Sequence, residues 1–257
     1  MISTRKYGRP APVSQDGDAA SAVAAAERTY VTELSTALVA LGHSVEIWTL
    51  QFDSEPHMEV AERGLPVRRF RGGEIGYIPK RRPCAWIPRW VTNAGTYLAL
   101  ARRANITLVT HDWEAGIAGK LLASEFGLPL IYVPHSLGQS TLESGRVREE
   151  REVLGAASTV VATTPGQRDL LVGNAYGVPA QRVAIIPSPF GGGADGLTWT
   201  DVAFRFVEVA QPRSGSATLC HAAVGPALAG DLSEGGGAGY VEAGLANCPV
   251  TVNDSIL

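Results

Sequence analysis

Residues 105–138, NITLVTHDWEAGIAGKLLASEFGLPLIYVPHSLG, indicate a strand, a helix and a second strand in close succession. The runs 105–110 and 128–134 are mostly apolar and contain the β-branched and aromatic residues that favour strands. Between them, residues 113–127 read as a helix. Two strands joined by a crossover helix are the unit from which parallel sheets are built. The stretch therefore predicts a parallel sheet covered by helices.

The same alternation extends from about residue 27 to residue 187. Helices are expected at 27–43, 88–104, 145–157 and 165–177, and strands at 44–50, 158–164 and 182–187. The first three residues, MIS, read as the end of a further strand, whereas the polar and basic stretch 51–87 carries no expected element. Because the strands are almost continuously apolar, they predict a sheet buried on both faces. The predicted fold class is α/β, with a doubly wound parallel sheet.

The regular alternation stops after residue 187. A glycine-rich segment is followed by a short amphipathic helix at 197–210, and residues 211–239 are mostly Ala, Gly and Ser. Order resumes at 240–254 with the pattern of a helix, a turn and a strand. We therefore predict an N-terminal Rossmann-like domain at 1–188, an irregular linker with one short helix at 189–230, and part of an incomplete second α/β domain at 231–257.

Composition restricts the class of protein. The chain has 257 residues, of which 45% are hydrophobic, so it can bury a core. Its net charge is −3, so it has no excess of basic residues that would bind nucleic acid. Its three cysteines form neither a metal-binding pair nor a disulfide framework, which predicts a reducing, cytoplasmic location. No run approaches the roughly 20 apolar residues of a membrane span. Contact with a membrane surface and the oligomeric state stay open.

Polar side chains follow two of the predicted strands. His111, Asp112 and Trp113 come directly after the first strand of the opening stretch, and His135 follows the second. Ligands of parallel sheets bind at the carboxyl ends of the strands, where imidazole and carboxylate groups can bond sugar hydroxyls and an indole can face a sugar ring. Two structural alternatives stay open, namely that Asp112 only caps the following helix and that His135 is a satisfied structural histidine.

Several segments together resemble a known family. The segments YVTELSTALVALGHSVEIWT, HDWEAGIAG, PHSLG, REEREVLGAASTVVATTPGQRDLL and RVAIIP are similar, in the right order, to the N-terminal domain of retaining GT-B glycosyltransferases of family 4. This group includes sucrose-phosphate synthase and glycogen synthase. The segment SEGGGAGYVEAGLANCPVTVND resembles the glutamate signature of the C-terminal domain of the same family. On its own, such a glutamate pair would more often be solvated.

The resemblance implies a GT-B fold and a hexosyltransferase that retains configuration. Its co-substrate would be a nucleotide diphosphate sugar. The acceptor would be a hydroxyl group of a sugar or sugar phosphate, and the enzyme would need no metal or other cofactor. The implied catalytic residues are Asp112 at the accepting centre, and His135 and Glu234 at the donor sugar. The resemblance further implies nucleotide or donor contacts at Glu242, Gly237 and Ala238, and acceptor-side contacts at His111 and Trp113.

The sequence departs from the family pattern on the donor side. Between residues 187 and 234 only Arg205 and Arg213 are cationic, whereas the family places there an arginine and a lysine that stabilise the leaving diphosphate. The family also has a Gly-Gly turn just before the segment ERTYV, and in this sequence those positions fall within Ala24–Ala26. Two hypotheses follow: an active glycosyltransferase, and an inactive remnant or sugar-binding module that keeps only the N-terminal crevice. A dinucleotide-dependent oxidoreductase is disfavoured because no Gly-x-Gly-x-x-Gly follows a strand.

Overall fold

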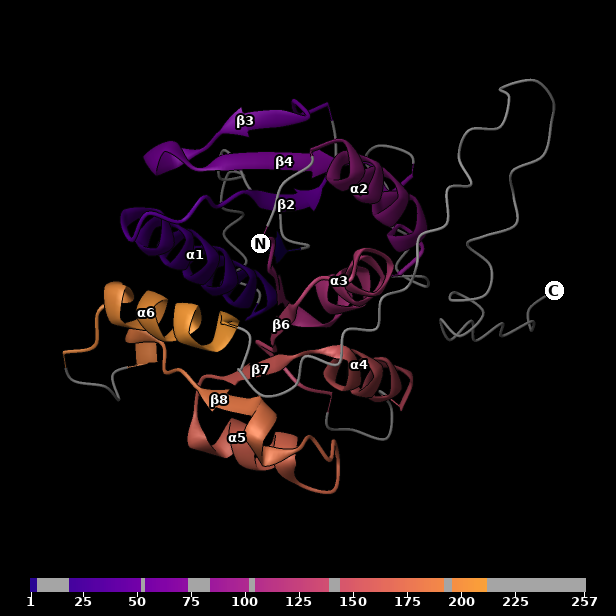
Figure 1. Ribbon diagram of the computed structural model, residues 1–257. Coiled ribbons are helices and arrows are strands. Elements are labelled where there is room, and N and C mark those ends of the chain that lie inside the picture. Colours follow the sequence, from indigo (N-terminus) through magenta and orange to yellow (C-terminus); the bar gives the residue numbers. More distant parts are fainter. Residues whose placement is uncertain are drawn as a thin grey trace, which may run out of the picture.

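The computed structural model in Figure 1 describes residues 1–3, 19–51, 54–73, 84–101, 105–138, 144–191 and 196–211. Over these ranges an eight-stranded sheet runs in the order β3-β4-β2-β1-β5-β6-β7-β8. All neighbouring strands are parallel except β3 and β4. The strands are β1 (Ile2–Ser3), β2 (Ile47–Leu50), β3 (Met58–Val60), β4 (Pro66–Phe70), β5 (Leu108–His111), β6 (Leu130–Val133), β7 (Thr159–Ala162) and β8 (Val183–Ile185).

Helices cover both faces of the sheet, which confirms the predicted doubly wound class. They are α1 (Ala19–Ala40), α2 (Ile87–Ala101), α3 (Asp112–Phe126), α4 (Ser144–Ala156), α5 (Pro165–Val172) and α6 (Trp199–Ala210). Helices α1 and α6 lie side by side on one face, and α2, α3 and α4 form a row on the other (Figure 1). None of the described helices has the length and apolar character needed to cross a bilayer.

The strand order changes direction between β1 and β5. From β1 the chain builds the sheet outward through β2 and β4, and it then returns to add β5, β6, β7 and β8 on the other side of β1. At such a reversal the following connections diverge to opposite faces, which leaves room for a ligand at the carboxyl ends of the strands. The fold therefore positions a site next to the end of β5.

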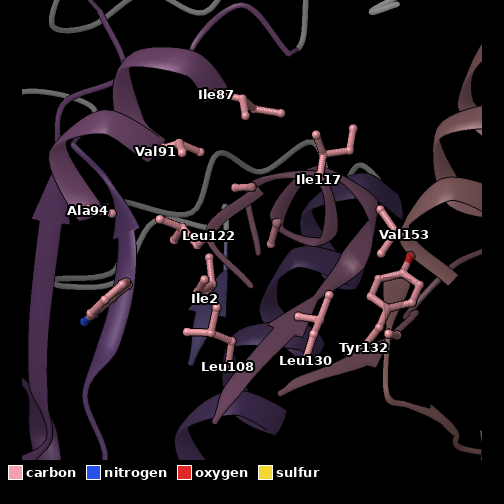
Figure 2. Close-up of a cluster of buried hydrophobic side chains, with 14 of the residues drawn as sticks. Ile2, Ile87, Val91, Ala94, Leu108, Ile117, Leu122, Leu130, Tyr132 and Val153 are labelled. Atoms are coloured by element: carbon pink, nitrogen blue, oxygen red, sulfur yellow. The ribbon is translucent and has the colours of Figure 1, made fainter. Parts of the chain in front are cut away.

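The larger core lies between the sheet and the row of α2, α3 and α4. Figure 2 shows side chains of α2 and α3 meeting those of the central strands, among them Ile2, Ile87, Val91, Ile117, Leu122 and Leu130. Gly119 lets α3 approach the sheet closely, because a Cβ there would lie 2.3 Å from Thr110 Cγ2 of β5. Gly116 lets α3 approach both α4 and β6, because a Cβ there would lie 2.8 Å from Val153 Cγ1 and 3.0 Å from Tyr132 Cε2. Close packing of α3 fixes where its first residues lie.

Two strands were missed in the stretch to which no element was assigned. Strand β4 contains Arg68 and Arg69, and two adjacent arginines do not resemble a buried strand. The Arg69 side chain is nevertheless 1% exposed, because it forms ion pairs with Glu55 and Glu59. Ion pairing with residues outside β4 thus allows a polar sequence to pair in the sheet.

Helix boundaries differ from the prediction mainly at α1. This helix begins at Ala19 rather than at residue 27, because the alanine-rich segment before it has high helix propensity but no apolar periodicity. Helix α5 ends at Val172 rather than at residue 177, and the remaining predicted helices and strands agree with the structure within about three residues.

The helix expected at 197–210 is α6, and it packs against α1. Its side chains Val202, Ala203 and Phe206 are buried in the core on that face of the sheet. A capping box between Thr198 and Asp201 fixes its start. Although α6 follows the predicted domain boundary at residue 188, it covers the same sheet as the helices before that boundary. The predicted partial domain at 231–257 lies outside the described residues.

Candidate functional site

Five residues from three segments contribute to the region at the carboxyl ends of β5 and β6. Pairing of His111 with Val133 in the parallel ladder brings the residues after both strands together. We call the resulting group the strand-end site; its members are Asp112, Trp113, His135, Ser136 and Arg146. The sequence predicted the first three of these positions, whereas Ser136 and Arg146 were not assigned a role.

Asp112 is held at the start of α3. It is the first residue of the helix, has a φ of 65°, and is 7% exposed. The N-cap position of α3 belongs to His111, whose side chain makes no capping hydrogen bond. The Asp112 carboxylate accepts a hydrogen bond of 3.3 Å from the Ser136 hydroxyl. Asp112 thus has a side-chain contact outside α3, and its role as a ligand-binding residue stays a prediction.

His111 and His135 form a hydrogen-bonded pair. His111 Nδ1 and His135 Nε2 are 3.0 Å apart, and the two rings stack with 19° between their planes. Burial, and next the neighbouring His135, hold the pKa of His111 well below its ordinary value. Two neutral imidazoles can share one hydrogen bond, with one ring donating and the other accepting.

The ring of His111 is 0% exposed, whereas His135 is partly exposed. An acceptor-side contact of His111 was predicted, but a fully buried ring offers no surface to an acceptor. The structure places His111 where it can support His135. His135 is hydrogen-bonded, as the structural alternative expects, and it is also partly exposed, so its contact with a ligand stays a prediction.

Tyr30 connects the histidine pair to α6. Its ring makes edge contacts with His135 at 5.3 Å, with His111 at 5.8 Å and with Trp199 at 5.1 Å between centroids. The Tyr30 hydroxyl is buried and has no hydrogen-bond partner among the described residues, and burial raises the pKa of Tyr30. Apolar periodicity in the α1 sequence marks Tyr30 as a core residue but gives no sign of its histidine contacts.

Arg146 of α4 contributes the positive charge of the strand-end site. Its Nη2 donates a hydrogen bond of 2.7 Å to the Ser136 hydroxyl and lies 3.9 Å from Asp112 Oδ1. The guanidinium carbon lies 5.8 Å from the centre of the Trp113 ring. A carboxylate, a hydroxyl, a guanidinium and an indole are thus grouped, and such a set can bind a polar ligand that carries both hydroxyls and an anionic group.

A second carboxylate lies deeper, at Glu150. It is completely buried and accepts hydrogen bonds from Arg146 Nε (2.8 Å) and from the Gly138 amide (3.1 Å). The hydroxyl of Tyr176 contacts the same carboxylate. Partial burial and this hydrogen bond raise the pKa of Tyr176, so the hydroxyl keeps its proton. The spacing of Arg146 and Glu150 by one helical turn is visible in the sequence but is common on surface helices.

The predicted donor-side residues Glu234, Gly237, Ala238 and Glu242 lie outside the described residues. Where side chains are described, no group of three or more His, Cys, Asp and Glu residues could hold a metal ion. The described members of the strand-end site all lie between residues 112 and 146.

A family model described as Glycosyl transferase 4-like domain matches residues 26–189. Among curated proteins, the chain is 27% identical over 209 residues to mannosylfructose-phosphate synthase of Agrobacterium fabrum, with 72% of this chain and 46% of that protein covered. It is 31% identical over 195 residues to D-inositol 3-phosphate glycosyltransferase of Kineococcus radiotolerans, with 68% and 42% covered. The chain thus spans less than half the length of these relatives.

Solved structures show the same fold. A chain of sucrose-phosphate synthase from Thermosynechococcus elongatus matches with a TM-score of 0.58 and 22% identity, over 70% of this chain and 92% of that one. A longer chain of the same enzyme matches with a TM-score of 0.55 and 24% identity, over 63% of this chain and 42% of that one. At this level of identity the likeness concerns the fold.

Proposed function

Because the chain belongs to the family of glycosyl transferase 4-like domains, we propose that the strand-end site binds the acceptor in transfer of a hexose from a nucleotide diphosphate sugar. The observation that carries the proposal is the grouping of Asp112, Ser136 and Arg146 at the reversal of strand order. A ligand at this place would meet an acidic, a hydroxyl and a cationic group together. The match of the family model to residues 26–189 supports this choice.

The acceptor that fits this set is a phosphorylated polyhydroxy compound. A guanidinium and a hydroxyl are preferred partners of phosphate oxygens, so Arg146 and Ser136 would bind the phosphate. The Asp112 carboxylate would accept a hydrogen bond from a hydroxyl of the same molecule, and Trp113 would face its ring. Support comes from the relatives, one of which is named a mannosylfructose-phosphate synthase and the other a D-inositol 3-phosphate glycosyltransferase.

The remaining assignments belong to the donor. His135 would contact hydroxyls of the donor sugar and Glu234 would hold that sugar, while Glu242 would bind the ribose of the nucleotide. Backbone amides at Gly237 and Ala238 would contact the donor as well. Transfer would retain configuration by front-face attack with the leaving diphosphate as base, without a metal. We place this chemistry in the cytoplasm.

A second candidate is a binding module without transferase activity. It is favoured by the donor-side departures, namely Ala24–Ala26 in place of a Gly-Gly turn and only Arg205 and Arg213 as cations between residues 187 and 234. Loss of groups that stabilise the leaving diphosphate would cost roughly a hundredfold in rate for each group. In this case the acceptor side would still bind its ligand.

The two candidates are separated by a binding and turnover experiment on the 257-residue chain. UDP-, GDP- and ADP-glucose and GDP-mannose are titrated calorimetrically, and fructose 6-phosphate and D-inositol 3-phosphate are titrated separately. Mixtures are then analysed by mass spectrometry for a glycosylated phosphate. Product supports the transferase; binding of a sugar phosphate without nucleotide-sugar binding or product supports the module. If neither class of ligand binds at millimolar concentration to the folded chain, both candidates are refuted.

A further inference from the structure

The buried carboxylate of Glu150 joins the parts of the strand-end site. It contacts Arg146 on its own helix, Gly138 in the connection after β6, and Tyr176 in the connection after α5. We propose that Glu150 is a positioning residue, which fixes both the guanidinium of Arg146 and the segment that carries His135 and Ser136. As a statement about acceptor binding, this inference rests on the proposed function above.

The contacts of Glu150 determine the orientation of the guanidinium. Glu150 Oε1 accepts from Arg146 Nε at 2.8 Å, and this contact turns Nη2 toward Ser136, whose hydroxyl it reaches at 2.7 Å. A guanidinium is planar, so fixing one edge fixes the direction of the other donors. Without Glu150 the long Arg146 side chain could adopt other rotamers and lose its place beside Ser136.

The same carboxylate holds the connection after β6. Its two oxygens lie 3.1 and 3.2 Å from the Gly138 amide, and the Tyr176 hydroxyl lies 2.7 Å from the Gly138 carbonyl. Gly138 follows His135 by three residues, so anchoring it limits how far that histidine can move. Glu150 and Tyr176 therefore bind both polar groups of one peptide residue at the edge of the site.

The neighbouring Glu149 provides a comparison on the same helix. It is also buried, at 5% exposure, but it forms an ion pair with Arg148 at 3.3 Å. A buried carboxylate needs compensating donors wherever it lies. What distinguishes Glu150 is that two of its donors are Arg146, a member of the strand-end site, and the Gly138 amide, in the connection that carries His135 and Ser136.

The test compares Glu150→Gln and Tyr176→Phe with the control Glu149→Gln. Heteronuclear NMR of each protein follows the Gly138 amide and the Arg146 Nε–H, and the chain is titrated with inorganic phosphate and with fructose 6-phosphate. We expect Glu150→Gln to shift both signals, speed their hydrogen exchange, and weaken binding of both probes by about tenfold, as expected for a lost charge-assisted hydrogen bond. Glu149→Gln should bind within a factor of about two of the parent chain.

Tyr176→Phe keeps the inference testable if Glu150→Gln fails to fold. It removes one hydroxyl only, and it should weaken phosphate binding by roughly threefold while shifting the Gly138 signal. The inference is overturned if the Gly138 and Arg146 signals and the phosphate affinity are the same in the folded variants and in the control. If the parent chain binds neither probe, the proposed acceptor is refuted. The positioning role of Glu150 is then judged by NMR alone, and it is refuted if Glu150→Gln leaves the Gly138 and Arg146 signals unchanged.

Discussion

His111 and His135 are hydrogen-bonded through Nδ1 and Nε2 at 3.0 Å, although they follow two different strands of the sheet. One ring is fully buried and the other reaches the surface. The buried ring therefore sets the orientation, and through the shared proton the tautomer, of the exposed one. This relationship gives the first of four predictions.

Replacing His111 by Phe should make the free energy of unfolding fall less between neutral pH and weak acid than it does in the parent chain. Because the folded-state pKa of His111 lies well below the ordinary value of 6.5, the unfolded chain binds the additional proton first. The stability that this neutral ring contributes is present above pH 6.5 and is lost as the pH falls toward the folded-state value, by about 1.4 kcal/mol per pH unit. Thermal unfolding midpoints between about pH 7 and pH 5 measure the difference.

The amino group of Met1 changes protonation in part of the same range, since burial lowers its pKa to about 5. It is common to the parent and the variant, so the difference between the two pH profiles reports His111 together with its electrostatic coupling to His135 and to this amino group. Parallel pH profiles for both proteins would contradict a neutral, buried His111.

Arg146→Ala should weaken binding of a phosphorylated acceptor while leaving nucleotide-sugar binding unchanged. The guanidinium lies beside Ser136 and Trp113 and is the cation that we assign to the phosphate. Loss of a charged hydrogen-bond donor predicts an increase in Kd of about tenfold or more for fructose 6-phosphate. Arg148→Ala, two residues away with a half-exposed side chain, is the matched control in calorimetric titrations. Equal affinity in both variants would remove Arg146 from the phosphate site.

Gly119→Ala should destabilise the fold by about 1–3 kcal/mol through overpacking. The new Cβ would lie 2.3 Å from Thr110 Cγ2 and would push α3 away from β5. Gly155 of α4 is the control, since a Cβ there would meet nothing within 4 Å. Gly155→Ala should be neutral or stabilise by up to about 1 kcal/mol. Urea unfolding of the two variants provides the comparison, and equal midpoints would argue against tight packing of α3.

Phe206→Ala should destabilise the protein by about 3–5 kcal/mol, whereas Phe204→Ala should change stability by less than about 0.5 kcal/mol. Phe206 is 2% exposed in the core under α6, and Phe204 on the same helix is 54% exposed. A small effect of Phe206→Ala on the unfolding midpoint would mean that α6 does not share the core of the sheet in solution.

The sequence predicted those parts of the fold in which local pattern and burial agree. Strands β5 and β6 are apolar and follow one another with a single helix between them, so both the parallel pairing and the nearness of Asp112 to the segment after β6 could be predicted. Strand β4 could not, because the burial of Arg69 depends on ion pairs with Glu55 and Glu59 and on a hydrogen bond to the Pro56 carbonyl, all outside β4.

The candidate site divides in the same way. Residues that directly follow a predicted strand can be assigned to the site from their position in the sequence. Tyr30, Arg146 and Glu150 lie on helices, and their contacts with the site depend on tertiary packing. A tyrosine on an apolar helical face and an Arg-Glu pair one turn apart are both common outside functional sites. Only the three-dimensional arrangement distinguishes them.

The left-handed backbone of Asp112 limits which substitutions can report on its chemistry. At a φ of 65°, asparagine and aspartate are tolerated far better than alanine or β-branched residues. An alanine scan would therefore combine loss of the carboxylate with a backbone rearrangement at the start of α3. Asparagine, which keeps both the size and the dihedral preference, is the substitution that separates the negative charge from the conformation that presents it.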